Sequence, residues 1–301
     1  MNSNFNYVFS KLKKMCKNTY KNVKLCDISS FRIGGRAKVL VEPCSLEEII
    51  KVMDFISSRN IKYFVVGNCT NLLFADEGYN GVIVKISAGL SHIEKMGNSI
   101  IADAGASLNT VTLFATENGL KGMEDAIGIP GAVGGAVTMN AGAYNFRINS
   151  VVKSVVVFMD GKIKLLNNTD CKFGYRQSLF KTNKCIILRV EFVLEKGKKS
   201  ELKQRQTEIM ECRRASQPLS QPSAGCVFKN PDGLSVARLI DEMGMKGYSI
   251  GGAMISTKHA NFIVNAGGAT SDDVQRLVEH VKSEIKTNCN IDLGTEIINV
   301  N

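Results

Sequence analysis

Residues 126–142 read AIGIPGAVGGAVTMNAG and are the most informative stretch of this sequence. Five glycines and Pro130 lie there among small apolar residues. Glycine reaches backbone angles that other residues avoid and lets another group approach the main chain closely. Such a stretch forms either a cradle of backbone amides for a phosphate or a tight turn packed against a neighbouring element. Composition alone leaves both interpretations open.

The composition is that of an ordinary globular protein, with 44% hydrophobic and 22% charged residues over a length of 301. No apolar run is long enough to cross a bilayer, and the lysine-rich residues 1–26 lack the apolar core of a signal peptide. We therefore expect a cytoplasmic protein without membrane insertion. The formal charge of +10 favours anionic partners, but no nucleic-acid-binding motif is present, so we expect small ligands and no nucleic acid.

The 9 cysteines include no CxxC pair, and the 3 histidines have no metal-ligand spacing. This pattern predicts free thiols in a reducing compartment and no metal site. His259, in TKHANFIVN, could line a site, but a lone histidine is more often structural.

Helical and strand patterns alternate along the chain, which predicts an α+β fold. Capping signals predict helices that begin at Ser45, Ser107 and Thr270. Asp160 and Gly161 predict a hairpin turn. The apolar residues 291–300, IDLGTEIINV, predict a final strand.

Four further segments place polar or reactive side chains at positions that a purely structural core would not require. VVGNCTNLLF follows a buried strand with small polar residues, a common ligand-binding position. Arg176, in FGYRQSLF, could clamp a carboxylate or phosphate, or could stack as a surface residue on Phe173 or Phe180. Cys226 could be reactive or a buried structural thiol. Glu296 lies in an apolar strand, where it is either functional or at an exposed alternate position.

Taken in order, these segments resemble the UDP-N-acetylenolpyruvoylglucosamine reductase family. The resemblance begins with SFRIGGRA at Ser30 and continues through VVGNCTNLL, ADAGAS and GIPGAVGGAVTMNAGAY. It then takes in FGYRQSLF, QPSAGCVFKNP, HANFIVN and GTEI. Many motifs in register are far more specific than any single one.

The resemblance implies a two-subdomain FAD-binding fold of the vanillyl-alcohol-oxidase type over residues 27–198, divided near residue 75. An α+β substrate domain follows over residues 199–301, with a last strand that returns to the FAD region. The implied reaction uses NADPH and noncovalent FAD to reduce UDP-N-acetylglucosamine enolpyruvate to UDP-N-acetylmuramate for peptidoglycan. A monomer is the expected state.

The resemblance also assigns site residues. The catalytic ones are Arg176, which stabilises developing charge, Cys226, the proton donor, and Glu296. The substrate-binding ones are Tyr175, Lys229 and Asn230. Those expected to bind FAD are Gly67, Asn68, Cys69, Thr70, Asn71, Leu72, Gly105, Gly128, Ile129, Pro130, Gly131, Gly134, Gly135, Asn140 and Gly142.

Two positions depart from the family pattern. Cys226 stands where the family has a serine, and a thiol with a reference pKa of about 8.5 remains able to donate a proton. Cys69 stands where the family more often has a glycine, so the backbone there must tolerate a side chain. Two alternatives stay open: a catalytically silent UDP-sugar-binding protein, and another FAD oxidoreductase of the same fold.

Overall fold

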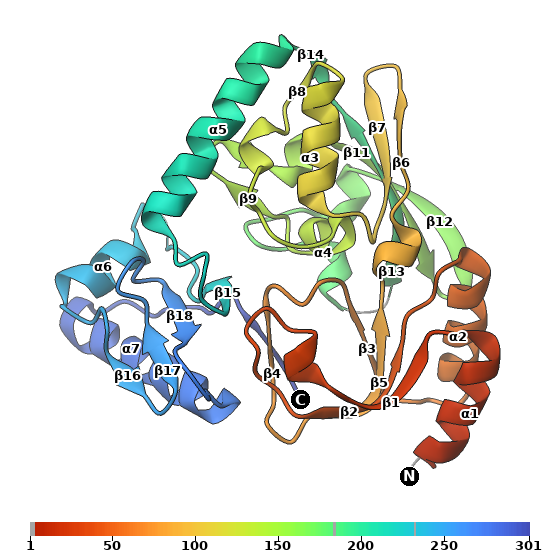
Figure 1. Cartoon of the computed structure of the whole chain (residues 1–301), viewed down its shortest axis with the longest axis horizontal. Helices are drawn as coiled ribbons and strands as arrows, with labels where there is room; N and C mark the ends of the chain where they lie inside the picture. The colour runs from red at the N-terminus through yellow and green to blue at the C-terminus, as the bar shows by residue number, and fades with distance from the viewer. Residues whose placement is uncertain (1–3, 183–184, 232) are drawn as a thin grey trace. The chain divides into compact units, whose positions relative to one another are not determined.

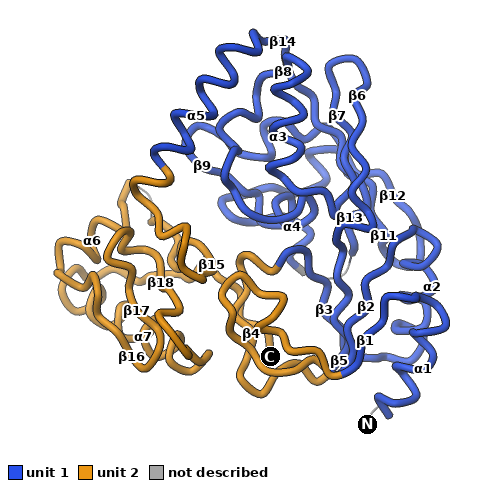
Figure 2. Tube along the Cα trace, in the orientation of Figure 1, with its two compact units in different colours: residues 1–21, 38–68, 81–212 blue, residues 22–37, 69–80, 213–301 orange. Residues whose placement is uncertain are grey.

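The computed structural model describes residues 4–182, 185–231 and 233–301 and divides into two compact units. Unit 1 comprises residues 1–21, 38–68 and 81–212, and unit 2 comprises residues 22–37, 69–80 and 213–301 (Figure 2). Each unit is therefore built from stretches that are distant in sequence. The expected boundaries at residues 75 and 198 stay a prediction.

Helices and strands alternate along the chain, as the sequence predicts (Figure 1). The helices are α1 (Phe5–Met15), α2 (Leu46–Ser58), α3 (Leu108–Glu117), α4 (Val133–Thr138), α5 (Lys199–Ser216), α6 (Val236–Glu242) and α7 (Ser271–Cys289). The Ser45 hydroxyl accepts a hydrogen bond from the Glu48 amide, which confirms the predicted start of α2.

The largest sheet of unit 1 is antiparallel and has the strand order β12-β11-β13-β7-β6. Its strands are β6 (Ile93–Met96), β7 (Ser99–Asp103), β11 (Val152–Met159), β12 (Lys162–Asn167) and β13 (Cys185–Val193). Met159 pairs with Lys162, and Asp160 and Gly161 between them both have positive φ. This is the two-residue hairpin turn that the sequence predicts.

A second sheet has the order β1-β2-β5-β3, in which β3 and β5 are parallel. Its strands are β1 (Thr19–Lys24), β2 (Arg36–Val41), β3 (Tyr63–Val66) and β5 (Tyr79–Lys85). Two short ribbons complete the set: β8 (Leu120–Lys121) with β14 (Glu195–Lys196), and β9 (Gly142–Ala143) with β10 (Phe146–Arg147).

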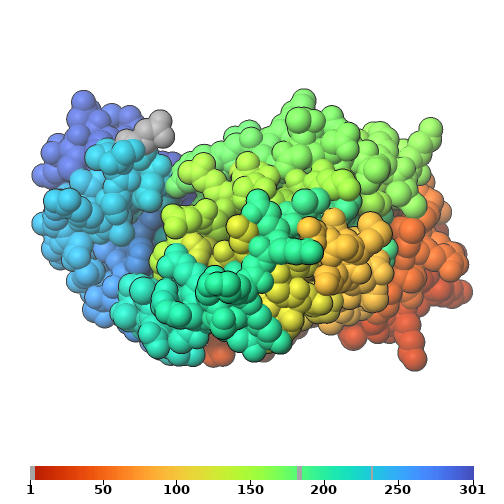
Figure 3. Space-filling model, turned by 90° about the horizontal axis from the view of Figure 1, so that it is seen from above, coloured from red at the N-terminus to blue at the C-terminus, as the bar shows by residue number. Residues whose placement is uncertain are grey.

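Helix α5 is largely polar and lies at the surface, in teal in Figure 3. Two side-chain contacts attach its unit 1 part to the underlying elements. Arg205 forms a bidentate ion pair with Asp125 (2.7 and 3.0 Å), and the Gln206 amide donates to the Thr116 hydroxyl of α3 (2.8 Å). Buried polar contacts therefore supplement its few apolar ones, such as Ile209.

Unit 2 contains an antiparallel sheet in the order β15-β18-β17-β16, against which α7 packs. Its strands are β15 (Ser223–Cys226), β16 (Ser249–Ile250), β17 (Ala253–Ile255) and β18 (Phe262–Asn265). The capping box of Thr270 and Asp273 is present at the start of α7, as predicted. In the same unit β4 (Leu72–Phe74) pairs in parallel with β19 (Ile298–Val300).

One local prediction is wrong and another, the start of α3 at Ser107, is confirmed without its capping hydrogen bond. Residues 291–300 do not form one strand, because Thr295 bridges to Phe228 while β19 pairs with β4. This change of partner interrupts the strand. Ser107 occupies the N-cap position of α3, but its side chain makes no capping hydrogen bond with the described residues. Its backbone instead bridges to Ala132.

Candidate active site

The glycine-rich segment folds back on the start of α3 in unit 1. The Gly134 amide donates to the Ala104 carbonyl (2.8 Å), and the Leu108 amide donates to the Gly131 carbonyl (3.1 Å). Gly131 has a φ of +120°, which only glycine adopts easily. A Cβ on Gly134 would lie 3.1 Å from that of Ala104. The tight-turn interpretation is therefore correct for these glycines.

Gly135 has a different environment, since it is exposed and a Cβ built on it meets no atom within 4 Å. It lies inside α4 with helical backbone angles, where glycine costs about 1 kcal/mol relative to alanine. Nothing in the described fold requires glycine here. The open space beside this backbone leaves room for a group that approaches the main chain closely, so the segment fits a cofactor.

Other glycines expected at the cofactor have packing reasons of their own. A Cβ on Gly105 would collide with the Ser87 carbonyl, and one on Gly142 would lie 2.7 Å from the Phe146 carbonyl oxygen. Gly67 follows β3, and a Cβ there would lie 3.3 Å from that of Ala132. Gly67 therefore lies beside the glycine-rich segment, and the exposed Asn68 follows it.

Arg176 lies in a tight turn of unit 1. Gly174 and Gln177 exchange two backbone hydrogen bonds (2.9 and 3.1 Å), and Tyr175 and Arg176 are the two residues between them. Arg176 has a φ of +53° at the turn position that usually holds glycine. Its guanidinium donates to the Gly142 carbonyl (3.0 Å) and lies 5.5 Å from the centre of the exposed Tyr175 ring.

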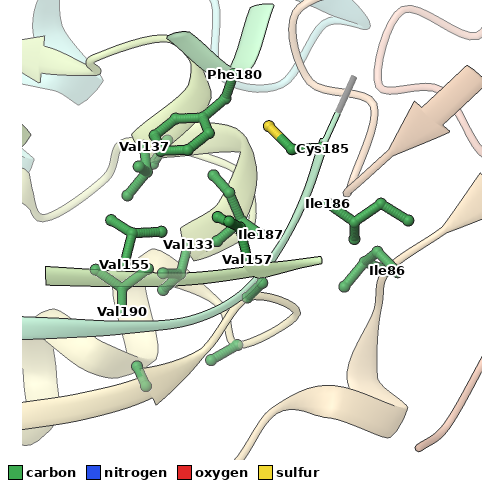
Figure 4. Packing of buried hydrophobic residues seen from close by; sticks show 14 of the residues in the cluster. Ile86, Val133, Val137, Val155, Val157, Phe180, Cys185, Ile186, Ile187 and Val190 are labelled. Atoms are coloured by element: carbon green, nitrogen blue, oxygen red, sulfur yellow. The ribbon is translucent and has the colours of Figure 1, made fainter. Parts of the chain in front are cut away.

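The same core anchors this turn and the glycine-rich segment. Val133 and Val137 of α4 and Phe180, which follows the turn, point into one apolar cluster with strands β11 and β13 (Figure 4). Phe180 is buried in this cluster, and the alternative that Arg176 stacks as a surface residue on Phe173 or Phe180 stays a prediction. The structure brings together Arg176, Tyr175 and the glycine-rich segment.

Cys226 ends β15 in unit 2 and is half-buried. A register shift separates the Ser223–Val264 pair from the Cys226–Phe262 pair, and Gly225 between them has a φ of +78°. Such a bulge redirects the side chain of the bulged strand. The residues after Cys226 are held by Asn261, whose carboxamide accepts from the Phe228 amide and donates to its carbonyl (both 2.9 Å).

Glu296 lies on a segment paired with the residues that follow Cys226. The Glu296 amide donates to the Val227 carbonyl (2.7 Å), and the Lys229 amide donates to the Gly294 carbonyl (2.9 Å). The Asn71 carboxamide donates to the Glu296 carbonyl (3.2 Å). Unit 2 therefore brings together Cys226, Glu296 and Lys229 with Asn71. Asn230 follows, and its side chain accepts from the Val236 amide at the start of α6 (3.1 Å).

The remaining residues of the GNCTNLL motif also belong to unit 2. Cys69 is buried and has a φ of +52°, so the side chain that replaces the family's glycine occupies a left-handed position. The Ser30 hydroxyl donates to the Ser223 carbonyl (2.7 Å) and thus joins SFRIGG to β15. Thr70 is half-buried, and Leu72 begins β4.

Asn261 is a structural contributor to the site that sequence reasoning missed. Asparagine is uncommon in strands, so its place in the apolar run ANFIV was the available signal. His259 is half-buried, and this partial burial lowers the pKa of its imidazole. Its Nδ1 accepts from the Asn261 amide (3.3 Å). In the described residues no group of acidic, histidine or cysteine side chains could hold a metal. None of the described helices is long and apolar enough to span a bilayer.

Two family models match the chain: the FAD binding domain over residues 37–167, and the UDP-N-acetylenolpyruvoylglucosamine reductase C-terminal domain over residues 217–300. A reductase of that name from Caldanaerobacter subterraneus subsp. tengcongensis is 42% identical over 290 residues, or 95% of this chain and 96% of its own. The chain belongs to the UDP-N-acetylenolpyruvoylglucosamine reductase family. The reductase of Clostridium kluyveri is also 42% identical, covering 89% of this chain and 88% of its own.

Solved structures agree with this assignment to the reductase family. The crystal structure of the enzyme from Thermus caldophilus, MurB, has a TM-score of 0.83 and 36% identity, covering 93% of this chain and 98% of that one. The family and the α+β FAD-binding fold expected from the sequence are thereby confirmed.

Proposed function

We propose that this chain reduces the enolpyruvyl group of UDP-N-acetylglucosamine enolpyruvate with NADPH, giving UDP-N-acetylmuramate for peptidoglycan synthesis. The observation that carries the proposal is the similarity to reductases of this name over 95% of the chain. That similarity does not favour the two alternatives, a catalytically silent UDP-sugar-binding protein and another FAD oxidoreductase of the same fold. When bound, FAD accepts hydride from NADPH and donates it to one carbon of the enolpyruvyl double bond.

Arg176 is our candidate for stabilising the charge that this hydride addition creates. As hydride reaches one carbon, negative charge spreads onto the neighbouring carbon and the substrate carboxylate. A guanidinium fixed before the reaction stabilises such charge without reorganising. The strained turn and the bond to Gly142 supply that fixation.

Cys226 is our candidate for the proton donor. Its S–H bond breaks as the proton passes to the carbon beside the one that received hydride, and the thiolate later regains a proton from solvent. Glu296, on the segment paired with Val227, would orient that thiol. We assign Lys229 to the diphosphate of the UDP-sugar and place Tyr175 and Asn230 at the substrate.

The FAD-binding residues that we propose in unit 1 are Gly67, Asn68, Gly105, Gly142 and the segment from Gly128 to Gly135. Backbone amides there would stabilise the pyrophosphate.

The test follows NADPH oxidation with and without UDP-N-acetylglucosamine enolpyruvate, after confirming that the purified protein releases FAD on denaturation. We expect turnover that requires this substrate, is lost in Cys226→Ala and is largely kept in Cys226→Ser. Full turnover in Cys226→Ala would exclude Cys226 as the proton donor. A rate of NADPH oxidation that the enolpyruvyl substrate does not raise would exclude the reaction itself.

We further propose that the enzyme acts as a monomer in the cytoplasm. None of the nine cysteines is joined in a disulfide, which is compatible with a reducing compartment. Sedimentation equilibrium tests the first statement, and cell fractionation tests the second.

A further inference from the structure

Asn140 lies at the end of the glycine-rich segment and is 6% exposed. Its carboxamide nitrogen donates to the Gly174 carbonyl (2.8 Å), and its carboxamide oxygen accepts from the Asn149 amide (3.2 Å). Both polar atoms of the side chain are thus bonded to backbone. The motif resemblance assigned this residue to FAD, but its contacts lead to the turn that carries Arg176.

That turn requires restraint from outside. Arg176 has a φ of +53°, and a left-handed residue with a side chain costs about 1–2 kcal/mol. Strained backbone persists only when its surroundings enforce it. The Asn140 carboxamide holds the first carbonyl of the turn, at Gly174, which is also the acceptor of the Gln177 amide.

Two other contacts join the same pair of segments. The Arg176 guanidinium donates to the Gly142 carbonyl, and the Ser178 hydroxyl donates to the Thr138 carbonyl (2.6 Å). The three bonds therefore join residues 138–142 to residues 174–178. Of the three, the Asn140 bond is the one that reaches the Gly174 carbonyl, where the turn begins.

We propose that Asn140 is a positioning residue for Arg176 rather than a side-chain ligand of FAD. Its carboxamide keeps the turn left-handed at Arg176, so that the guanidinium stays directed to the place where substrate charge develops. This inference rests on the proposed role of Arg176. A misplacement of about 1 Å in such a group costs on the order of 100-fold in rate.

Asn140→Asp is the first test variant. The carboxylate still accepts from the Asn149 amide and tolerates the positive φ of +43°, but it cannot donate to Gly174. Asn140→Gly is the second, because glycine adopts this φ without strain and removes the side chain. The matched control is Asn168→Asp, since the Asn168 amide also donates to backbone carbonyls, at Asn149 and Val152, without contacting the turn.

The experiment separates the two half-reactions of the holoenzyme by stopped flow and measures the FAD Kd by flavin fluorescence. In both Asn140 variants we expect reoxidation of the reduced flavin by the enolpyruvyl substrate to slow by about 100-fold. Flavin reduction by NADPH and the FAD Kd should stay within about twofold of wild type. Asn168→Asp should lower the melting temperature without slowing flavin reoxidation relative to flavin reduction.

Four outcomes decide the inference. A weaker FAD Kd with both half-reactions slowed would make Asn140 a cofactor ligand. A lower melting temperature with unchanged rates would make its role purely structural. Arg176→Ala serves as the reference: if it leaves reoxidation unchanged, the proposed role of Arg176 fails. If Arg176→Ala is slow while the Asn140 variants are normal, the positioning role alone fails.

Discussion

At the scale of single residues, three of the expected site residues have left-handed backbone angles. Cys69, Asn140 and Arg176 all have φ between +43° and +53°. Left-handed angles are tolerated by asparagine but are costly for cysteine and arginine. Strain of this kind is retained where the geometry is used.

Cys69 offers a direct measure of that strain. Cys69→Gly relieves the left-handed angle and Cys69→Ala does not, although both remove the buried thiol. We expect the Gly variant to be more stable than the Ala variant by about 1 kcal/mol in urea unfolding. Cys185, a buried cysteine of strand β13, is the control. There glycine should be less stable than alanine by about 0.5–1 kcal/mol, and the same order at both positions would contradict the strain.

A substitution at Gly135 tests whether FAD binds at the glycine-rich segment. Because a Cβ there meets no atom of the protein, Gly135→Ala should stabilise the FAD-free protein by up to about 1 kcal/mol. The same methyl group would obstruct a cofactor that approaches the backbone. We therefore expect the FAD Kd to rise at least about tenfold, which corresponds to about 1.4 kcal/mol.

Melting of the FAD-free protein and FAD titration together check this prediction. Gly134→Ala is the contrasting variant, since its methyl group would press on Ala104 and should lower stability even without FAD. An unchanged FAD Kd in Gly135→Ala would place the cofactor elsewhere.

At the scale of elements, the sequence predicted those features that depend on residues close together in the chain. Two such features depend on local backbone angles and hydrogen bonds, and the sequence therefore predicts them: the turn at Asp160 and Gly161 and the capping box of Thr270 and Asp273. The break in residues 291–300 was not predicted, because it depends on pairing with Phe228 and with β4. Phe228 lies 67 residues before Thr295 (295 − 228), and Leu72 lies 226 residues before Ile298 (298 − 72).

The site divides in the same way. Motifs indicated Arg176, Cys226, Glu296 and Asn71 as residues, but not the main-chain atoms with which Asn71 and Asn261 form hydrogen bonds, because those atoms belong to distant segments.

The attachment of α5 predicts a pH dependence. Hydrogen bonding to Arg205 holds the pKa of Asp125 below its usual range. A depressed folded pKa adds stability above the unfolded pKa of about 3.9, and that stability is lost as pH falls through the folded value. Asp125→Asn should therefore cost about 1–2 kcal/mol at pH 7, and this difference should shrink as pH falls below about 4.

Urea unfolding of both proteins across this pH range checks the prediction. Glu208→Gln is the control, since Glu208 contacts Arg205 at 3.7 Å and is half exposed. It should change stability by less than about 0.5 kcal/mol. A cost for Asp125→Asn that does not vary with pH would show that the ion pair is not its origin.

At the scale of the whole molecule, unit 2 depends on stretches that precede its main part. Phe31, Ile33 and Leu73 are buried in the same cluster as residues of α6 and α7. β19 pairs with β4, so the last strand of the chain needs residues 72–74 as its partner. A domain defined as one continuous range of the sequence therefore does not describe unit 2, which combines three separate stretches.

Residues 213–301 alone should therefore not fold. Burial of a large apolar side chain contributes about 1.5–3 kcal/mol, so losing Phe31, Ile33 and Leu73 removes roughly 4.5–9 kcal/mol. A domain has only about 5–15 kcal/mol in total. We expect this fragment to show poorly dispersed amide resonances and no cooperative melting, whereas the full chain melts cooperatively in the same buffer. Adding a peptide of residues 22–37 should restore little cooperative melting to the fragment, because β19 would still lack its partner strand β4. Cooperative melting of the fragment alone would mean that residues 213–301 hold a sufficient core without the two earlier stretches.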